Sequence, residues 1–156
     1  MKKIILFLPD DTATISLSHS LANICNNAII IYLYGDLGSG KTTFSRGFLQ
    51  KLGYRGHIKS PTYNIVESYN IALMNIYHLD LYRLSNAAEL ECIGIRDYCN
   101  KNAICLIEWP EKGLGFLPEA DISLYFYYKQ KGREVSIEAL TQHGNLLVTQ
   151  FQKKPW

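Results

Sequence analysis

Two apolar runs mark the centre of the fold that the sequence predicts. Residues 28–34 and residues 103–107 contain no charged side chain, and polar residues bound each run. Continuous apolarity of this kind is typical of strands that are covered on both faces, as in a parallel sheet. We therefore expect both runs to be central strands. A shorter apolar run, residues 4–8, ends at Pro9 and predicts a first strand.

Two amphipathic helices are expected to cover these strands. Asp10 and Asp11 offer N-cap side chains at the start of the first helix, and Gly53 follows the second helix as a C-terminal cap. In both segments apolar residues recur at near-helical spacing, so that each helix would pack through a single stripe. The stripe residues are Ala13, Leu17, Leu21 and Ile24 in the first segment and Phe44, Phe48 and Leu52 in the second.

The remaining segments predict two hairpins and shorter helices. A helix that starts near Asn86 is interrupted at Gly94, and residues 145–151 predict a short last helix. The expected hairpin strands are residues 63–69 with 73–79 and residues 121–128 with 133–140. Together these segments predict an α/β fold with a mixed, mainly parallel central sheet and an antiparallel flap.

Composition narrows the class of protein. With 156 residues, 47% of them hydrophobic, the chain has room for one domain with a sizeable core, spanning residues 1–156. The net charge of +2 falls well short of the excess typical of a dedicated nucleic-acid binder. No apolar stretch approaches the length of a membrane span, and the first apolar run is too short for a secretory signal. The four cysteines share no metal-type spacing and nothing suggests export, so we expect buried free thiols and a cytoplasmic protein.

A phosphate-binding loop follows the first central strand directly. Residues 35–42 read GDLGSGKT, which matches the pattern G-x-x-x-x-G-K-[ST], and a helix-like segment comes next. In this setting backbone N–H groups converge on phosphate oxygens, and the positive end of the helix faces the anion. We expect Lys41 to reach the outer phosphates and the Thr42 hydroxyl to bind Mg²⁺. A three-layer fold like that of P-loop NTPases is therefore expected. The expected nucleotide-binding residues of the loop are Gly35, Gly38, Ser39, Gly40, Lys41, Thr42 and Thr43.

Two acidic residues compete for the role of supporting the metal. Asp80 ends a half-polar strand, whereas Glu108 lies at the carboxyl end of a buried one, where ligands bind in open α/β sheets. The alternative for each is a capped or salt-bridged acid without a function. We keep both, together with Lys41, as candidate catalytic residues, and both acids with Thr42 as candidate metal ligands.

Several other residues have less specific signals. Thr62 could act as a switch at the metal or the outer phosphate, or could simply belong to a turn that leads into a strand. Trp109 could adjoin the nucleotide, with an ordinary packed tryptophan as the alternative. The histidines show no ligand spacing, and none is assigned a role. ATP is preferred to GTP because residues 100–103, NKNA, lack the acid of the Asn-Lys-x-Asp element that recognises guanine.

Four ordered motifs carry a resemblance to a known family. They are GDLGSGKTT at residues 35–43, SPTY at 60–63, HLDLYR at 78–83 and IEWP at 107–110. With these motifs in this order, the chain resembles the bacterial TsaE family, formerly called YjeE. The resemblance extends over nearly the whole chain. Ser39 stands where alanine is frequent in the family, a small change that leaves the backbone cradle intact.

The resemblance implies a function in tRNA modification. TsaE proteins are ATPases needed to make threonylcarbamoyladenosine in tRNAs that read codons beginning with A. They act with TsaD, which performs the transfer, and with TsaB, while TsaC supplies the threonylcarbamoyl adenylate. The implied role is to bind the TsaD–TsaB pair and to reset it between turnovers by ATP binding and hydrolysis. The protein would therefore meet tRNA only through that complex.

The resemblance also implies roles for single residues. Thr42 and Glu108 would bind Mg²⁺, while Asp80 would support the metal or its water. Thr62 would be the switch, and Trp109 would adjoin the site. Asp11 and Lys131 would border the adenine.

The expected chemistry is slow. Backbone amides, Lys41 and Mg²⁺ would neutralise the phosphates, while Glu108 or Asp80 would orient the attacking water. No internal arginine finger is evident, although Arg83 is a candidate, so partners are expected to stimulate hydrolysis. Two other classes stay open. A small-molecule kinase would yield a phosphorylated acceptor, although no arginine-rich lid follows the core, and a switch module would bind ATP without needing turnover.

Overall fold

The computed structural model describes residues 1–25, 27–100 and 102–154. Residue 101, in the stretch compared with the guanine-recognition element, lies outside these ranges. The strands are β1 (Lys3–Leu8), β2 (Ile29–Tyr34), β3 (Val66–Ile71), β4 (Met74–Asp80), β5 (Ala103–Glu108), β6 (Ile122–Lys129) and β7 (Gly132–Ala139). The helices are α1 (Asp11–Ile24), α2 (Lys41–Leu52), α3 (Glu89–Ile93), α4 (Ile95–Tyr98) and α5 (Gln142–Gln152), with a 3-10 helix, η1 (Pro110–Gly113).

The strands form one seven-stranded sheet in the order β1-β7-β6-β2-β5-β4-β3. Strand β2 pairs in parallel with both β5 and β6, and β4 pairs in parallel with β5. The pairs β3 with β4, β6 with β7 and β1 with β7 are antiparallel, so only β3 and β7 run against the other strands. The prediction of a mixed, mainly parallel sheet with β2 and β5 near its centre is confirmed.

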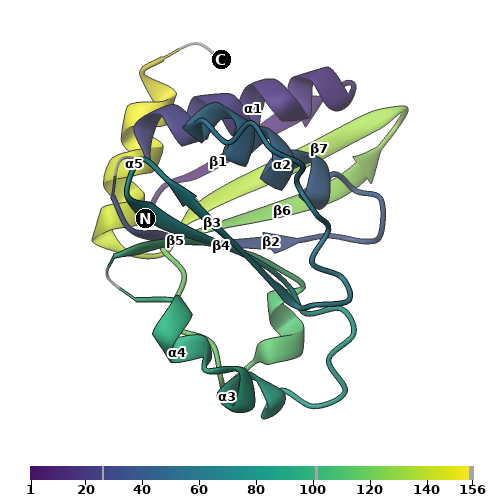
Figure 1. The fold of residues 1–156 in the computed structure, drawn as a ribbon. Coiled ribbons are helices and arrows are strands. Elements are labelled where there is room, and N and C mark those ends of the chain that lie inside the picture. Colours follow the sequence, from purple (N-terminus) through teal and green to yellow (C-terminus); the bar gives the residue numbers. More distant parts are fainter. Residues whose placement is uncertain (26, 101, 155–156) are drawn as a thin grey trace.

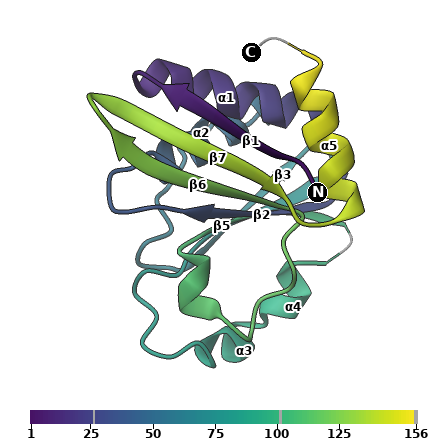
Figure 2. The same cartoon turned by 180° about the vertical axis from the view of Figure 1, so that it is seen from behind.

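Helices cover the sheet from both sides (Figure 1). Helices α1, α2 and α5 lie on one face, and α3, α4 and η1 lie on the other, as the reverse view also shows (Figure 2). Strand β5 explains the continuous apolar pattern, because its residues alternate between the two cores. Ile104 and Leu106 pack in the core with α1 and α2, whereas Cys105 and Ile107 pack in the core with α3 and α4. This confirms the three-layer arrangement.

Local boundaries differ from the sequence expectations at three points. Residues 63–65 form a turn rather than the start of a strand, and Ile65 has a φ of 68°. The hairpin between β3 and β4 turns at Ala72 and Leu73, which both have positive φ, as the two-residue turns that match strand twist require. Helix α5 begins earlier than expected because the Thr141 hydroxyl caps it by accepting a hydrogen bond from Gly144 N at 3.0 Å.

The sheet places the functional motifs at one edge. Strands β2, β4 and β5 run in the same direction, so their carboxyl ends meet beside the N-terminus of α2. The register pairs Asp80 with Glu108 and Leu33 with Glu108. Within the described residues, no helix is both long and apolar enough to cross a membrane.

Candidate functional site

A pocket of about 310 Å³ opens at the carboxyl edge of the sheet. It brings together residues from the loop before α2, the ends of β4 and β5, the start of α1 and the β6–β7 hairpin. Ten of the residues singled out from the sequence line it: Asp11, Gly38, Gly40, Lys41, Thr42, Thr43, Thr62, Asp80, Glu108 and Trp109. Leu37, Tyr82 and Arg133 also line it and were not among the expected site residues.

The loop owes its shape to backbone conformations that favour glycine. Gly38 and Gly40 have φ angles of 75° and 116°, and Gly40 is the N-cap of α2 without any side-chain cap. The first N–H groups of α2 therefore face the pocket without a capping side chain, which is the arrangement of an anion site. Gly35 and Ser39 do not line the pocket. Ser39 is fully buried, and its hydroxyl lies where a side chain on Gly35 would have to fit.

Lys41 is almost fully buried at the base of the loop. Its ammonium donates hydrogen bonds to the carbonyl oxygens of Gly35 and Asp36, the latter at 2.9 Å, and lies 4.4 Å from the centre of the Trp109 ring. Burial lowers the pKa of Lys41, and nearby carboxylates, chiefly Glu108, oppose that effect. The ammonium is thus held by neutral carbonyl acceptors, which the charged oxygens of a phosphate could replace.

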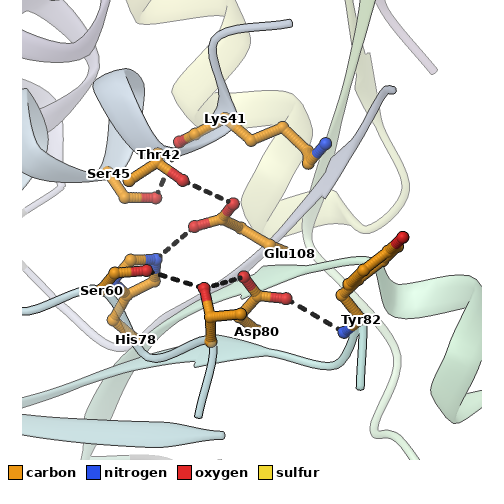
Figure 3. Close-up of polar contacts among 9 residues, drawn as sticks. Lys41, Thr42, Ser45, Ser60, His78, Asp80, Tyr82 and Glu108 are labelled. Carbon is orange, nitrogen blue, oxygen red and sulfur yellow. Dashed lines mark hydrogen bonds and ion pairs between the residues drawn. The ribbon is translucent and has the colours of Figure 1, made fainter. Parts of the chain in front are cut away.

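Thr42 and Glu108 form the oxygen-rich edge of the pocket (Figure 3). The Thr42 hydroxyl donates to Glu108 Oε1 at 3.1 Å, and Glu108 is only 2% exposed. Thr42 and Lys41 diverge from the start of α2, so that Thr42 points to Glu108 and Lys41 points away from it. Hydroxyl and carboxylate oxygens are ligands that Mg²⁺ prefers.

Asp80 lies beside this edge, held by two donors. The Tyr82 N–H donates to Asp80 Oδ1 at 3.0 Å, and the Thr62 hydroxyl donates to Oδ2 at 3.3 Å. Burial raises the pKa of Asp80 above that of an ordinary carboxyl, the charge of Glu108 adds to this, and the Tyr82 hydrogen bond opposes it. The Ser60 hydroxyl also contacts the Thr62 hydroxyl at 2.8 Å, so Thr62, the expected switch residue, connects Ser60 to the acid.

The donor set fits Mg²⁺ held jointly with a nucleotide. No group of three or more His, Cys, Asp or Glu side chains that could hold a metal occurs among the described residues. Mg²⁺ usually takes one or two carboxylates together with waters and substrate phosphates rather than an all-protein cage. The oxygens of Thr42, Glu108 and Asp80 therefore suit a metal that is shared with the phosphates of a bound ligand.

The β6–β7 hairpin holds the loop through two side chains near its turn. The Tyr128 hydroxyl donates to the Leu37 carbonyl at 2.6 Å, and Arg133 donates to the Gly38 carbonyl at 3.1 Å while its guanidinium lies 4.2 Å from the centre of the Tyr128 ring. Lys131, expected beside the adenine, is exposed in the turn and does not line the pocket. Because β6 and β7 pair up to Lys129 and Gly132, the turn carries Lys131 beyond the sheet edge, and its contact with a base stays a prediction.

Trp109 forms one wall of the pocket. Its φ of 57° and ψ of 48° lie in the left-handed region, which costs on the order of 1 kcal/mol or more for a residue other than glycine. The indole packs against Tyr82, with ring centres 5.0 Å apart, and covers the Lys41 ammonium. The strained backbone of Trp109 thus occurs at the residue whose side chain contacts the loop lysine.

His78 is a further residue at this site that the sequence pattern did not single out. It is fully buried on β4, and its Nε2 lies 2.5 Å from Glu108 Oε2. Spacing could not reveal this contact, because the partner lies 30 residues away on the neighbouring strand. Strand periodicity could have indicated it, because His78 and Asp80 are two residues apart on one strand and therefore lie on the same face as each other.

A family model and two curated relatives with the same description match this chain. The family model described as threonylcarbamoyl adenosine biosynthesis protein TsaE matches residues 8–135. The chain is 47% identical over 156 residues to the tRNA threonylcarbamoyladenosine biosynthesis protein TsaE of Haemophilus influenzae, covering 97% of this chain and 99% of the relative. Its identity to the Bacillus subtilis protein of that name is 32% over 127 residues, covering 80% and 78%. A crystal structure of YdiB from Bacillus subtilis shares the fold, with a TM-score of 0.83 at 24% identity over 97% of this chain and 95% of that one.

Proposed function

The chain belongs to the TsaE family, and on that premise we propose that it is a slow, Mg²⁺-dependent ATPase that supports the TsaD–TsaB complex in threonylcarbamoyladenosine biosynthesis. TsaE proteins take part in that pathway, as the names of the relatives state. The observation that carries the ATPase proposal is the contact between Thr42 and Glu108, which joins the phosphate-binding loop to the end of a central strand.

ATP would bind with its phosphates over the start of α2. The N–H groups of Gly38 to Thr43 would donate to phosphate oxygens, as the loop shape and helix direction favour. Lys41 would exchange its two carbonyl acceptors for the outer phosphates, where the added negative charge opposes the effect of burial on its pKa. Asp11, Trp109 and the hairpin would border the rest of the nucleotide.

Hydrolysis would depend on the two acids at the sheet edge. Mg²⁺ on Thr42 and Glu108 would neutralise phosphate charge as it develops. Asp80 is fixed by the Tyr82 N–H, and either Asp80 or Glu108 would accept a proton of the attacking water and orient it toward the outer phosphate. The hydrogen bond between Thr62 and Asp80 would couple the turn that contains Thr62 to that event.

The positions of two arginines support the proposal of slow turnover. Arg133 lines the pocket, but it donates to the Gly38 carbonyl and stacks on Tyr128. Arg83, the candidate finger, lies over the Tyr63 ring at 4.4 Å and is not among the lining residues. Because an arginine at the transition state contributes about 10³–10⁵ in rate, we infer that TsaD and TsaB supply or rearrange such a charge.

The test is ATP hydrolysis by the purified protein, alone and with TsaD and TsaB. We expect slow hydrolysis alone, stimulation by the partners, and loss of both in Lys41→Ala. Lys51→Ala is the matched control, because Lys51 is an exposed lysine at the far end of the same helix. Rapid hydrolysis by the protein alone, unchanged by the partners, would refute the proposal. A phosphorylated product in a metabolite screen would favour a kinase, and intact tRNA modification with inactive Glu108→Ala would favour a switch.

A further inference from the structure

Glu108 has a partner for each of its carboxylate oxygens. Oε1 accepts from the Thr42 hydroxyl at 3.1 Å, and Oε2 lies 2.5 Å from His78 Nε2. The two contacts come from opposite sides, Thr42 from the start of α2 and His78 from β4, as Figure 3 shows. A carboxylate held at both oxygens cannot rotate about its last bond without losing one of them.

The tautomer of His78 follows from its surroundings. The side chain is fully buried, and its Nδ1 has no hydrogen-bond partner within the described part of the chain. A buried N–H group without an acceptor is strongly disfavoured, whereas the contact at Nε2 faces a carboxylate oxygen. The proton therefore belongs on Nε2, which donates to Glu108 Oε2.

A role in filling the core does not account for this residue. Leucine would fill the space without leaving a buried ring nitrogen unpartnered, which is unfavourable for a polar group away from water. The neighbours of His78 on the same face of β4 are Ile76, deeper in the core, and Asp80, at the pocket. His78 thus lies where the apolar core ends and the candidate metal edge begins.

We propose that His78 is a positioning residue for Glu108: its Nε2–H holds Oε2 so that Oε1 stays turned to Thr42 and the metal edge keeps its shape. This inference rests on the proposed function, because it concerns the residue assigned there to Mg²⁺. Residues that hydrogen-bond a metal ligand typically contribute 10- to 100-fold to metal affinity.

The test compares two amide variants by calorimetry. In His78→Gln the amide nitrogen reaches the place of Nε2 and keeps the donor, whereas in His78→Asn it reaches only the place of Nδ1. ATP binding is titrated at a series of Mg²⁺ concentrations and again with EDTA, and thermal unfolding is followed for each protein. We expect the Mg²⁺ concentration for half-maximal enhancement of binding to rise about 10-fold or more in His78→Asn and to return toward wild type in His78→Gln. Binding of metal-free ATP should be the same in all three proteins.

Two results would overturn the role of His78. One is an unchanged Mg²⁺ dependence in His78→Asn, even with a lower unfolding temperature, because that is what a purely structural residue would give. The other is an equal shift in both variants, because the donor at Nε2 would then be irrelevant. If His78→Asn does not fold, His78→Leu serves as the donor-free variant. Failure of the proposed function is distinguishable, since the wild-type protein itself would then bind no ATP or bind it independently of Mg²⁺.

Discussion

Removing the Tyr128 hydroxyl should weaken ATP binding without harming the fold. The hydroxyl donates to the Leu37 carbonyl at 2.6 Å. In a trans peptide the C=O and the following N–H point in opposite directions, so fixing the Leu37 carbonyl outward turns the Gly38 N–H toward the pocket. Tyr128→Phe deletes only the oxygen, while Arg133 still holds the Gly38 carbonyl.

The expected size follows from one hydrogen bond. A hydrogen bond of this kind contributes about 0.5–1.5 kcal/mol, which corresponds to a factor of about 2–10 in an equilibrium constant. Tyr128 is 53% exposed, so water can replace part of the lost contact, and the lower half of that range applies. We therefore expect the Kd for ATP to rise about 2- to 5-fold in Tyr128→Phe.

The assay is calorimetric titration with ATP at fixed Mg²⁺, with urea unfolding as a check on stability. Tyr127→Phe is a matched control, because Tyr127 is the neighbouring residue of β6, is also 53% exposed, and its hydroxyl makes no hydrogen bond within the described ranges. Its Kd should equal that of the wild type. An unchanged Kd in Tyr128→Phe, or an equal rise in both variants, would refute the idea that this hydroxyl orients the loop.

Three further predictions concern the metal edge, the buried thiol and a tight helix start. Thr42→Val keeps the side-chain shape but removes the hydroxyl. The Mg²⁺ concentration for half-maximal enhancement of ATP binding should therefore rise about 10-fold or more in calorimetric titration. An unchanged concentration would exclude Thr42 as a ligand. Burial raises the pKa of Cys25 to about 12, so this thiol stays protonated at pH 8 and should resist iodoacetamide. Cys92 is exposed, contrary to the expectation of buried thiols, and should react. Comparable labelling of the two in peptide mass spectrometry after native labelling would contradict this prediction. Gly144→Ala would press its methyl group onto the backbone carbonyl of Asp121. The free energy of unfolding, measured by urea titration, should therefore fall by about 1–3 kcal/mol. A variant as stable as the wild type would contradict the close approach.

Local pattern was sufficient for most elements and for the phosphate-binding loop. The run of residues 28–34 contains β2, which lies in the middle of the sheet with alternate residues buried and the others half-buried, and its continuous apolarity indicated this position. The loop motif depends on neighbouring residues alone, since adjacent backbone groups and Lys41 form one local structure. The predicted ends of helices and strands were less accurate than the elements themselves. Caps such as Thr141 and two-residue turns such as Ala72-Leu73 depend on single side chains and dihedral angles.

The composition of the site depended on contacts that pattern cannot show. Glu108 was recognised as a strand-end acid, but its place between Thr42 and His78 follows from the parallel register of β4 and β5 and from the packing of α2 above them. Arg133, rather than Lys131, lines the pocket because the pairing of β6 with β7 decides which residues face the loop and which project beyond it. By itself, the sequence determined the phosphate-binding loop, the strands and the candidate acids, because each depends on residues close together in the chain. Only the tertiary structure decided which side chains hold those acids and that loop in place, because strand register and hairpin packing join residues far apart in the chain.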